Sequence, residues 1–372
     1  MLLAENIEGA ELVIEQAIIA GRECGLEINK QKSNIIIFNM RDRPQEIAGI
    51  NVKENVKYLG ITINNTKNLF KTHKENMLQK AVRLSNLTYS IVARSCSRLN
   101  IGKTYWKSVA LPSILYGANV VDFTKQEIEK LQRIENSVCR KILGAPSYSQ
   151  TSALKGEVGI SSMKARIMEG QLKYLQYILR GEGNDLIEKV VGEMRDQRKR
   201  NKWINGLLED RQKVGIRGDK ITSQEIRMKV KAWDKTMWKQ EMQEKVSLRI
   251  YRTWREEIGG QEEVYDNSEK SVILFKCRTN NMDLRDRKRF NNGSTECIMC
   301  GDELEDLSHF ILHCPAYNED RGRLPALQRP YQQDEDFVIG KVLFGSSEIE
   351  NIKTTLHKFW QTRERKIKEI TP

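Results

Sequence analysis

Apolar side chains recur three or four positions apart along most of this 372-residue chain, as they do in helices that bury one face. The first such stretch spans residues 10–24, and Gly25 is placed to end it as a C-terminal cap. Residues 103–116 predict another helix, with a break at Pro112 because proline lacks the N–H that a helix interior needs. We therefore predict a mainly helical protein. Its core stripes are Val13, Ala17, Ala20 and Cys24; Met77, Ala81, Leu84, Leu87 and Ile91; and Ile128, Leu131, Ile134, Val138 and Ile142.

Strand-like patterns are confined to the beginning of the chain. Residues 35–38 form an apolar run that predicts a buried strand, and residues 47–52 and 56–63 predict further short strands. In the last of these, Leu59, Ile61 and Ile63 alternate with less apolar neighbours, which is typical of a half-buried strand. The expected fold is mainly α, of the α+β type, with a small β region at its start.

A cluster of cysteine and histidine near the C-terminus predicts a metal site. Cys297 and Cys300 form a Cys-x2-Cys pair, eight residues separate Cys300 from His309, and four separate His309 from Cys314. Four such ligands at this spacing suit one tetrahedral Zn²⁺, and they leave no open coordination position, so the zinc is expected to be structural. The alternative is a set of ordinary buried thiols. Three of the seven cysteines and two of the four histidines fall within 18 residues, which favours the metal.

This segment contains two histidines, so the identity of the histidine ligand has two alternatives. His313 is adjacent to Cys314, so on a helix the two side chains would point about 100° apart. His309 is the better ligand on this ground, and His313 is its alternative.

The positive charge lies in the middle of the chain. The formal net charge is +12, and residues 64–180 alone carry a net +12, which is the distribution expected where a polyanion is held. A solvated helical surface is the alternative. A second basic run at residues 195–203 fits either a phosphate contact or a solvated linker. The tryptophans at 233, 238 and 254 favour core packing over base stacking. Candidate nucleic-acid contacts are Lys103, Lys107, Arg133, Arg140, Lys141, Arg198, Lys199 and Arg200.

The composition indicates in which part of the cell the protein is expected. No apolar run is long enough to cross a bilayer, and the N-terminus lacks the basic region and cleavage site of a secretory signal. Seven cysteines, some spaced for metal, indicate a reducing environment. We expect an intracellular protein of the nucleus or cytoplasm that is neither secreted nor bound to membranes.

Several motifs, in order, resemble those of one family. Gly25-Leu26-Glu27-Ile28-Asn29, Lys32-Ser33 and then Lys57-Tyr58-Leu59-Gly60-Ile61 resemble the end of the palm in reverse transcriptases of non-LTR (LINE-type, jockey-like) retrotransposons. Residues 111–117 and 131–144 are similar to the segments after that palm, and Cys314-Pro315-Ala316-Tyr317 to the family's terminal cysteine–histidine motif. The resemblance implies a palm remnant (1–64), a thumb-like helical domain (65–185), a charged helical connector (186–290), a zinc knuckle (291–325), and a loop and tail helix (326–372).

The resemblance also implies roles for single residues. Lys32 occupies the position of a palm lysine near the phosphates of the incoming nucleotide. Tyr58 and Gly60 match the hairpin that grips the primer end, where glycine lets backbones approach closely. The thumb lysines and arginines would follow the phosphates of a template–primer duplex of RNA and DNA, without reading sequence. An exposed lysine after a turn and an ordinary hairpin are the alternatives for Lys32 and the hairpin.

One departure from the family bears on activity. The family carries a Tyr/Phe-Ala-Asp-Asp tetrad just upstream of a segment like residues 1–5, and Asp42 is the one aspartate here before Asp122. Two-metal catalysis needs clustered carboxylates, so Mg²⁺ is expected only in the intact parent polymerase. The expectation is a truncated reverse transcriptase that retains nucleic-acid binding but does not polymerise by itself. One alternative is an active RNA-directed DNA polymerase when the chain is extended upstream or complemented by another palm. Another is a zinc-dependent protein-interaction module.

Overall fold

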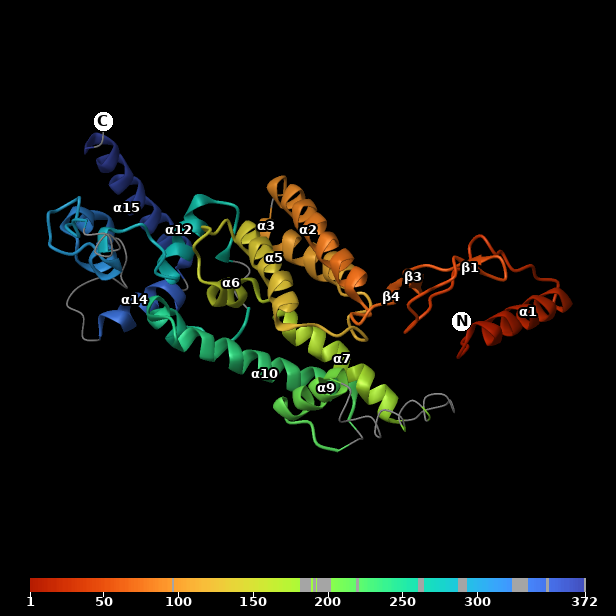
Figure 1. The fold of residues 1–372 in the computed structure, drawn as a ribbon. Coiled ribbons are helices and arrows are strands. Elements are labelled where there is room, and N and C mark those ends of the chain that lie inside the picture. Colours follow the sequence, from red (N-terminus) through yellow and green to blue (C-terminus); the bar gives the residue numbers. More distant parts are fainter. Residues whose placement is uncertain are drawn as a thin grey trace.

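The computed structural model describes residues 1–95, 97–180, 189, 192, 202–218, 221–259, 264–286, 293–322, 334–345 and 348–370. The described chain is mainly helical with a few short strands near its start, which confirms the predicted fold class (Figure 1). The longer described helices are α1 (Ile7–Glu23), α2 (Lys71–Ala93), α3 (Arg98–Tyr105), α5 (Lys125–Leu143), α6 (Thr151–Val158), α7 (Met163–Arg180), α9 (Lys202–Lys213), α10 (Ser223–Gln243), α12 (Glu269–Arg278), α14 (Glu335–Phe344) and α15 (Ile349–Ile370).

Shorter elements connect these helices. The strands are β1 (Glu46–Ile47), β2 (Ile50–Asn51), β3 (Asn55–Tyr58) and β4 (Ile61–Asn64). The short helical segments are α4 (Leu111–Ile114), α11 (Arg249–Trp254), α13 (Asn318–Arg321), η1 (Trp106–Ala110), η2 (Val246–Leu248), η5 (His309–His313) and η6 (Pro315–Tyr317). None of the described helices is both long enough and apolar enough to span a bilayer.

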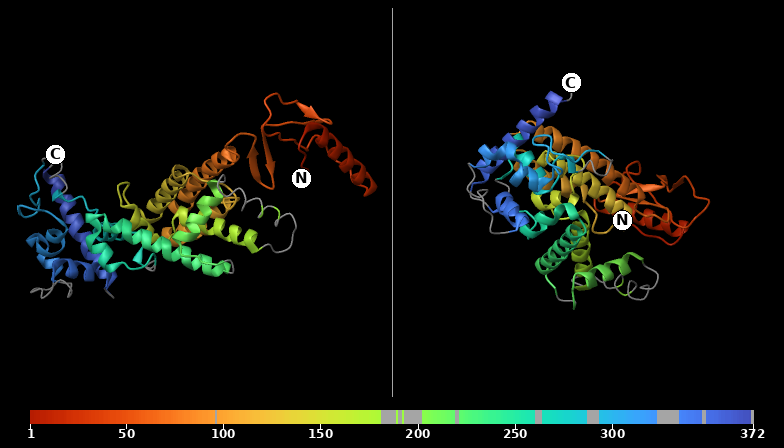
Figure 2. Two further views of the ribbon diagram at one scale, coloured as in Figure 1. Left: turned by 60° about the horizontal axis from the view of Figure 1, so that its bottom comes forward. Right: turned by 90° about the vertical axis from the view of Figure 1, so that its left-hand side faces the viewer.

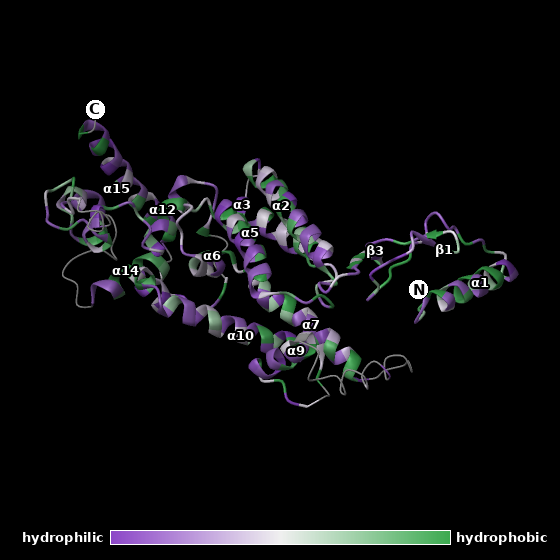
Figure 3. Cartoon of the chain, viewed as in Figure 1, coloured by the Kyte–Doolittle hydropathy of each residue, from purple (hydrophilic) through white to green (hydrophobic). Residues whose placement is uncertain are grey.

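The N-terminal region stands apart from the helical body (Figures 1 and 2). The predicted apolar face of α1 is wrong, because Ala20 and Cys24 are exposed and Ile14 is the buried residue of the helix. Ile7 and Ile18 share the side of Ile14 and pack with the β1–β2 hairpin. Isoleucine side chains bury more apolar surface than alanine, so they decide which side faces the hairpin. Green segments of α1 in Figure 3 mark the hydrophobic residues of this helix.

The strand predicted at residues 35–38 does not form. Ile35 makes two backbone hydrogen bonds to the end of β2 and the residues after it. Its N–H donates to the carbonyl oxygen of Asn51 at 2.9 Å, and its carbonyl oxygen accepts from the N–H of Lys53 at 2.8 Å. Phe38 is exposed, and Asn39 takes a positive φ of 59° that turns the chain away. The pairing is therefore an isolated bridge between Ile35 and Val52.

The β3–β4 hairpin forms where strands were predicted, but its buried face is the opposite one. Thr62 and Asn64 are buried, whereas Ile61 and Ile63 are half-buried. The polar side is buried because it meets α2. The backbone N–H of Thr62 donates to Nδ1 of His73 at 3.4 Å, and Oδ1 of Asn64 accepts from the N–H of Thr72 at 3.0 Å. Hydrogen bonds to the first turn of α2 thus override the apolar alternation.

Helices α2 to α7 form the body that holds the predicted phosphate contacts. Helix α2 lies along α5, and their shared core contains Met77, Ala81 and Val138 as predicted, with Trp106 also fully buried. Leu87, predicted to be core, is exposed, because the buried stripe of α2 runs through Ser85 and Thr88 instead.

Pro112 changes the helix type instead of breaking the helix. The chain runs from α3 through the π-helical turn η1 directly into α4, and Pro112 lies in the first turn of α4. Proline lacks the N–H that an uninterrupted α-helix would use there, and the π-helical turn lies directly before it.

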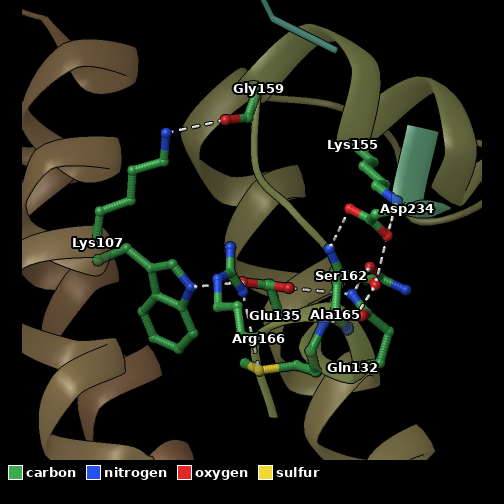
Figure 4. A network of polar contacts seen from close by, with 12 residues as sticks. Lys107, Gln132, Glu135, Lys155, Gly159, Ser162, Ala165, Arg166 and Asp234 are labelled. Atoms are coloured by element: carbon green, nitrogen blue, oxygen red, sulfur yellow. Dashed lines mark hydrogen bonds and ion pairs between the residues drawn. The ribbon is translucent and has the colours of Figure 1, made fainter. Parts of the chain in front are cut away.

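Buried polar bridges hold this body to α10 (Figure 4). The Glu135 carboxylate of α5 accepts from Trp106 at 3.0 Å and from Arg166 of α7 at 2.6 Å. Asp234 of α10 pairs with Lys155 of α6 at 2.7 Å and accepts the Ser162 hydroxyl at 2.6 Å. Each carboxylate is almost fully buried and fully partnered, so each fixes the relative placement of three helical segments.

The three tryptophans of this region lie on two helices, Trp233 and Trp238 on α10 and Trp254 at the end of α11. Trp238 is fully buried and donates to the carbonyl oxygen of Ser152 at 2.7 Å, which confirms the predicted core role. Trp233 and Trp254 are partly buried against neighbouring core clusters.

The C-terminal helices share one hydrophobic core with the cysteine–histidine segment. Phe310 belongs to the same core cluster as Ile273 of α12, Leu343 of α14 and Leu356 of α15. A fully buried carboxylate, Glu157 of α6, bonds Arg255 at 2.9 Å and Arg278 of α12 at 3.3 Å, and so ties this core to the helical body.

Candidate metal centre and nucleic-acid interface

The four predicted metal ligands converge. The ligand atoms of Cys297, Cys300, His309 and Cys314 all lie within 4.8 Å of one another. The sulfur atoms of Cys297 and Cys314 are 3.8 Å apart, and Nε2 of His309 is 3.3 Å from the sulfur of Cys300. With metal–sulfur and metal–nitrogen bonds of about 2.3 and 2.0 Å, tetrahedral coordination places such atoms roughly 3.5–3.8 Å apart. The cluster can therefore hold a metal ion.

The structure distinguishes the two histidines. His309 is buried and turns Nε2 toward the cysteines, while its Nδ1 lies 3.5 Å from a carboxylate oxygen of Asp302. A carboxylate behind a ligating imidazole fixes the ring and its tautomer. His313 instead pairs with Glu335 at 2.8 Å. His309 is the residue grouped with the cysteines.

Local backbone geometry brings the ligands together. Gly301, with φ of 82°, donates to the carbonyl oxygen of Cys297 at 2.8 Å and closes a tight turn around the first pair. A short helical segment ends in the π-helical turn η5, in which Cys314 donates to the carbonyl oxygen of His309 at 2.8 Å. The extra residue of a π-turn places positions 309 and 314 one above the other. Pro315 follows this turn and begins η6.

The centre is set inside a larger core. Cys297 and Cys314 are buried beside Phe310. Behind them, Glu305 receives two hydrogen bonds of 2.6 Å from Arg363 of α15, and both side chains are buried. A bidentate, desolvated pair of this kind fixes the knuckle on α15.

The electrostatics favour a thiolate at Cys297. The hydrogen bond from Cys314 lowers the pKa of Cys297 to about 5, and the backbone N–H groups of Met299 and Cys300 act in the same direction. The thiolate is the form that ligates metal.

The residues predicted to touch the primer end lie at the junction of the hairpin and the helical body. Tyr58 is partly exposed at the end of β3, and Leu59 and Gly60 form the turn with φ of 46° and 84°. The Tyr116 hydroxyl donates to the carbonyl oxygen of Leu59 at 2.8 Å. Lys32 is exposed in the N-terminal region, in a turn closed by Asn29. The structure thus joins Gly60 to the motif at residues 111–117.

Two predicted phosphate contacts have structural partners. Nζ of Lys107 donates to the carbonyl oxygen of Gly159 at 2.9 Å, at the C-terminal end of α6 (Figure 4). A Cβ built on Gly159 would lie 3.2 Å from Nζ of Lys103, so both lysines meet this helix end. Cations are stabilised there by the helix dipole.

The candidates on α5 differ in exposure. The Arg133 side chain is 76% exposed, with Glu129 at 3.8 Å. Arg140 is half-buried and donates to the carbonyl oxygen of Ser149 at 3.3 Å, and Lys141 lies 4.8 Å from the ring centre of Tyr89. Arg133 is therefore the best placed of the three to reach a phosphate.

Helix α2 and its C-terminal end add further exposed cations. Lys71, Arg83 and Arg94 are exposed, whereas Lys74 is buried and pairs with Glu127 at 3.1 Å. Lys74 therefore does not reach solvent, because it bridges α2 to the start of α5. Arg198, Lys199 and Arg200 lie outside the described residues.

Sequence reasoning missed several residues that the structure makes important. Tyr116 and Glu305 were not singled out, because their partners Leu59 and Arg363 lie 57 and 58 residues away. Asp302, whose partner His309 lies 7 residues away, was also missed. Asp302 follows the second cysteine by two residues, which is a signal for a carboxylate behind a metal ligand.

The fold and site define a helical protein with a Cys3His cluster that could hold a metal ion on its C-terminal core. Over 122 residues it is 25% identical to "RNA-directed DNA polymerase from mobile element jockey" of Drosophila melanogaster. The aligned part is 32% of this chain and 13% of that protein, so the chain matches a small part of its relative. This distant, partial similarity supports a relation to the reverse transcriptases of non-LTR retrotransposons. No family model matches the chain. No solved structure matches it either.

Proposed function

We propose that this chain is a nucleic-acid-binding part of a non-LTR retrotransposon reverse transcriptase. The observation that carries the proposal is its similarity to the jockey RNA-directed DNA polymerase. The net positive charge of residues 64–180 and the exposed cations of α2 and α5 support it, since phosphate contacts dominate the affinity for nucleic acids. We name Lys71, Arg83 and Arg133 the phosphate face.

The bound nucleic acid is an RNA template with its primer. In this proposal the phosphate face positions the duplex, and the Tyr58–Gly60 hairpin, held by Tyr116, lies at its primer end. The contacts would fix position and not sequence, because lysine and arginine bind the uniform backbone.

The metal of the Cys3His centre is zinc in this proposal. Thiolate and imidazole ligands in a tetrahedral arrangement suit Zn²⁺, and four protein ligands leave no position for a substrate. Zinc would hold the C-terminal core together and would take no part in chemistry.

The chain on its own is proposed not to polymerise. Asp42 is the one aspartate before Asp122, and it lies in an exposed loop of the N-terminal region. Polymerase chemistry needs two metal ions about 3.5–4 Å apart on clustered carboxylates. The similarity to a polymerase favours a second candidate, in which a complementing palm supplies those carboxylates and the assembly copies RNA.

A binding experiment tests the first proposal. Anisotropy of a labelled RNA template annealed to a DNA primer should give a Kd for the native chain. The variant Lys71→Gln/Arg83→Gln/Arg133→Gln should raise that Kd roughly tenfold or more. A charge-matched control, Arg227→Gln/Lys231→Gln/Lys239→Gln, changes exposed residues of α10, which lies apart from α2 (Figure 1). Equal effects of the two variants, or no binding at all, would contradict the proposal and favour a protein-interaction module.

A further inference from the structure

A cavity of about 720 Å³ lies between the metal segment, η2, α11 and the end of α12. Its size is within the range of small-ligand sites, roughly 300–1,000 Å³. Apolar side chains form much of its wall, with amide and hydroxyl groups among them. The lining includes Tyr148, Gln150, Ile250, Asn281, Asp306 and Leu307.

The wall of the cavity is held by buried contacts. Arg278, at the end of α12, lines the cavity and bonds the fully buried Glu157 at 3.3 Å. On the opposite side, Asp286 donates its backbone N–H to the carbonyl oxygen of Glu305 at 3.0 Å. Because Glu305 is itself fixed by Arg363, the cavity is preformed and does not depend on a ligand to shape it.

The chemistry of the wall suits a nucleobase. Tyr148 is 52% exposed at the cavity, and its hydroxyl donates to the carbonyl oxygen of Asn281 at 3.4 Å. A tyrosine ring offers a base a stacking surface, and Gln150 carries a side-chain amide that both donates and accepts hydrogen bonds. The buried Asn281 amide donates to the Thr279 hydroxyl at 3.0 Å and so helps to hold the wall. The lining contains Arg249 and Arg278 beside Asp286 and Asp306, so charge does not make it a phosphate site.

We infer that this cavity binds one unpaired base of a single-stranded segment of the bound RNA. The inference rests on the proposed function, because it presupposes that the chain holds RNA. A base in a duplex is stacked and paired, and it enters a side pocket only after leaving the stack. The cavity therefore takes the unpaired strand, while the phosphate face holds the paired region.

The position of the cavity couples it to the metal centre. Leu307 and Ser308 line the cavity and directly precede the metal ligand His309. Asp306, also in the lining, accepts the backbone N–H of His309 at 2.8 Å. The metal segment thus forms one wall of the base pocket.

The test compares two single-stranded RNA oligonucleotides, one intact and one with abasic sugars throughout its central segment. The native full-length chain should bind the abasic RNA about 5- to 100-fold more weakly, which is the range for loss of a stacked base. Tyr148→Ala should weaken binding of the intact RNA by a similar factor and leave binding of the abasic RNA unchanged. Tyr148→Phe keeps the ring and should bind both like the native chain.

Tyr177→Ala is the matched control, because Tyr177 on α7 has the same 52% exposure and does not line the cavity. Metal content and melting temperature confirm that each variant is folded. If Tyr148→Ala binds intact RNA like the native chain, or weakens intact and abasic RNA equally, the pocket assignment is overturned. The phosphate face remains supported in that case if its own variant still loses affinity. If the native chain binds neither RNA, the proposed function fails first and the pocket fails with it.

Discussion

Tyr116 closes over Gly60. Its hydroxyl donates to the carbonyl oxygen of Leu59 at 2.8 Å, and a Cβ built on Gly60 would lie 2.7 Å from Cε1 of the Tyr116 ring. Gly60 has φ of 84°, in the left-handed region that favours glycine. Two segments more than 50 residues apart are thus joined where a side chain at position 60 has no room.

Gly60→Ala should loosen this junction. The left-handed φ costs about 1 kcal/mol for alanine, and the contact with the Tyr116 ring adds about 1–3 kcal/mol. Hydrogen exchange of the Ile61–Asn64 amides should accelerate accordingly. Gly25→Ala is the control, because Gly25 has a similar φ of 71° with nothing within 4 Å of its built Cβ. Hydrogen exchange is measured at the amides next to each substituted glycine. If it accelerates equally in the two variants, the contact with the Tyr116 ring is unimportant.

His73 makes the same junction sensitive to acid. Burial lowers the pKa of His73. The positive charge of Lys80 lowers it further, whereas the hydrogen bond to the carbonyl oxygen of Tyr116 acts to raise it. Nδ1 accepts from Thr62, so the neutral ring with a proton on Nε2 is the folded form. A histidine pKa that is depressed on folding contributes stability above its unfolded value of about 6.5, and that stability is lost as pH falls.

Amide exchange at Thr62, corrected for its intrinsic pH dependence, should therefore show greater opening at pH 5 than at pH 7. His73→Gln cannot titrate and should remove this difference. An unchanged difference in the variant would assign the acid sensitivity to another group.

Glu157 should be one of the most sensitive positions in the chain. Burial alone would raise its pKa, but the guanidinium groups of Arg278 and Arg255, with hydrogen bonds from Tyr265 and Tyr251, hold its pKa below the ordinary value of 4.5. Its contribution is present above that value and is lost as pH falls below it. Glu157→Gln leaves two buried arginines without their charge partner and should cost about 3–5 kcal/mol in thermal or urea unfolding.

An exposed pair gives the comparison for Glu157. Glu129 faces Lys125 at 4.0 Å on the surface of α5, and Glu129→Gln should change stability by at most about 0.5 kcal/mol. Similar losses for the two variants would mean that the buried network is not the anchor inferred here.

Loss of the metal should affect more than the knuckle. We expect the native chain to hold one equivalent of zinc. Cys300→Ser and His309→Ala should each lose it, while His313→Ala and Cys24→Ser should retain it. Structural zinc sites contribute roughly 10–16 kcal/mol at neutral pH. Because Phe310 shares a core with α12, α14 and α15, hydrogen exchange should increase in those helices as well. Full zinc content in Cys300→Ser would contradict the site.

The parts of this fold that the sequence predicts are those that depend on local spacing. The stripe containing Val138 and Ile142 lies in the core as expected, and Cys297 to Cys314 converge, because both patterns are properties of one segment. Partners distant in sequence were not predictable. Lys107 is recruited to the end of α6 by a carbonyl group 52 residues away, and Thr62 is buried by α2. The cavity beside Tyr148 required four separate segments to be placed in space.

The domain boundaries near residues 64, 185, 290 and 325 stay predictions. The segment that carries the cysteines and His309 shares one core with α15. A domain boundary at residue 325 would divide that core between two domains. Limited proteolysis with mass spectrometry measures where the chain is cut first.

The salt dependence of RNA binding is the most direct test of the central proposal. If six to eight lysines and arginines contact phosphates, log Kobs should fall linearly with log salt concentration, with a slope of about −4 to −7. The phosphate-face variant, Lys71→Gln/Arg83→Gln/Arg133→Gln, should flatten that slope by about 2–3. The charge-matched α10 variant should leave it unchanged. A native slope near zero, or a slope flattened by the α10 variant instead, would contradict the placement of nucleic acid on α2 and α5.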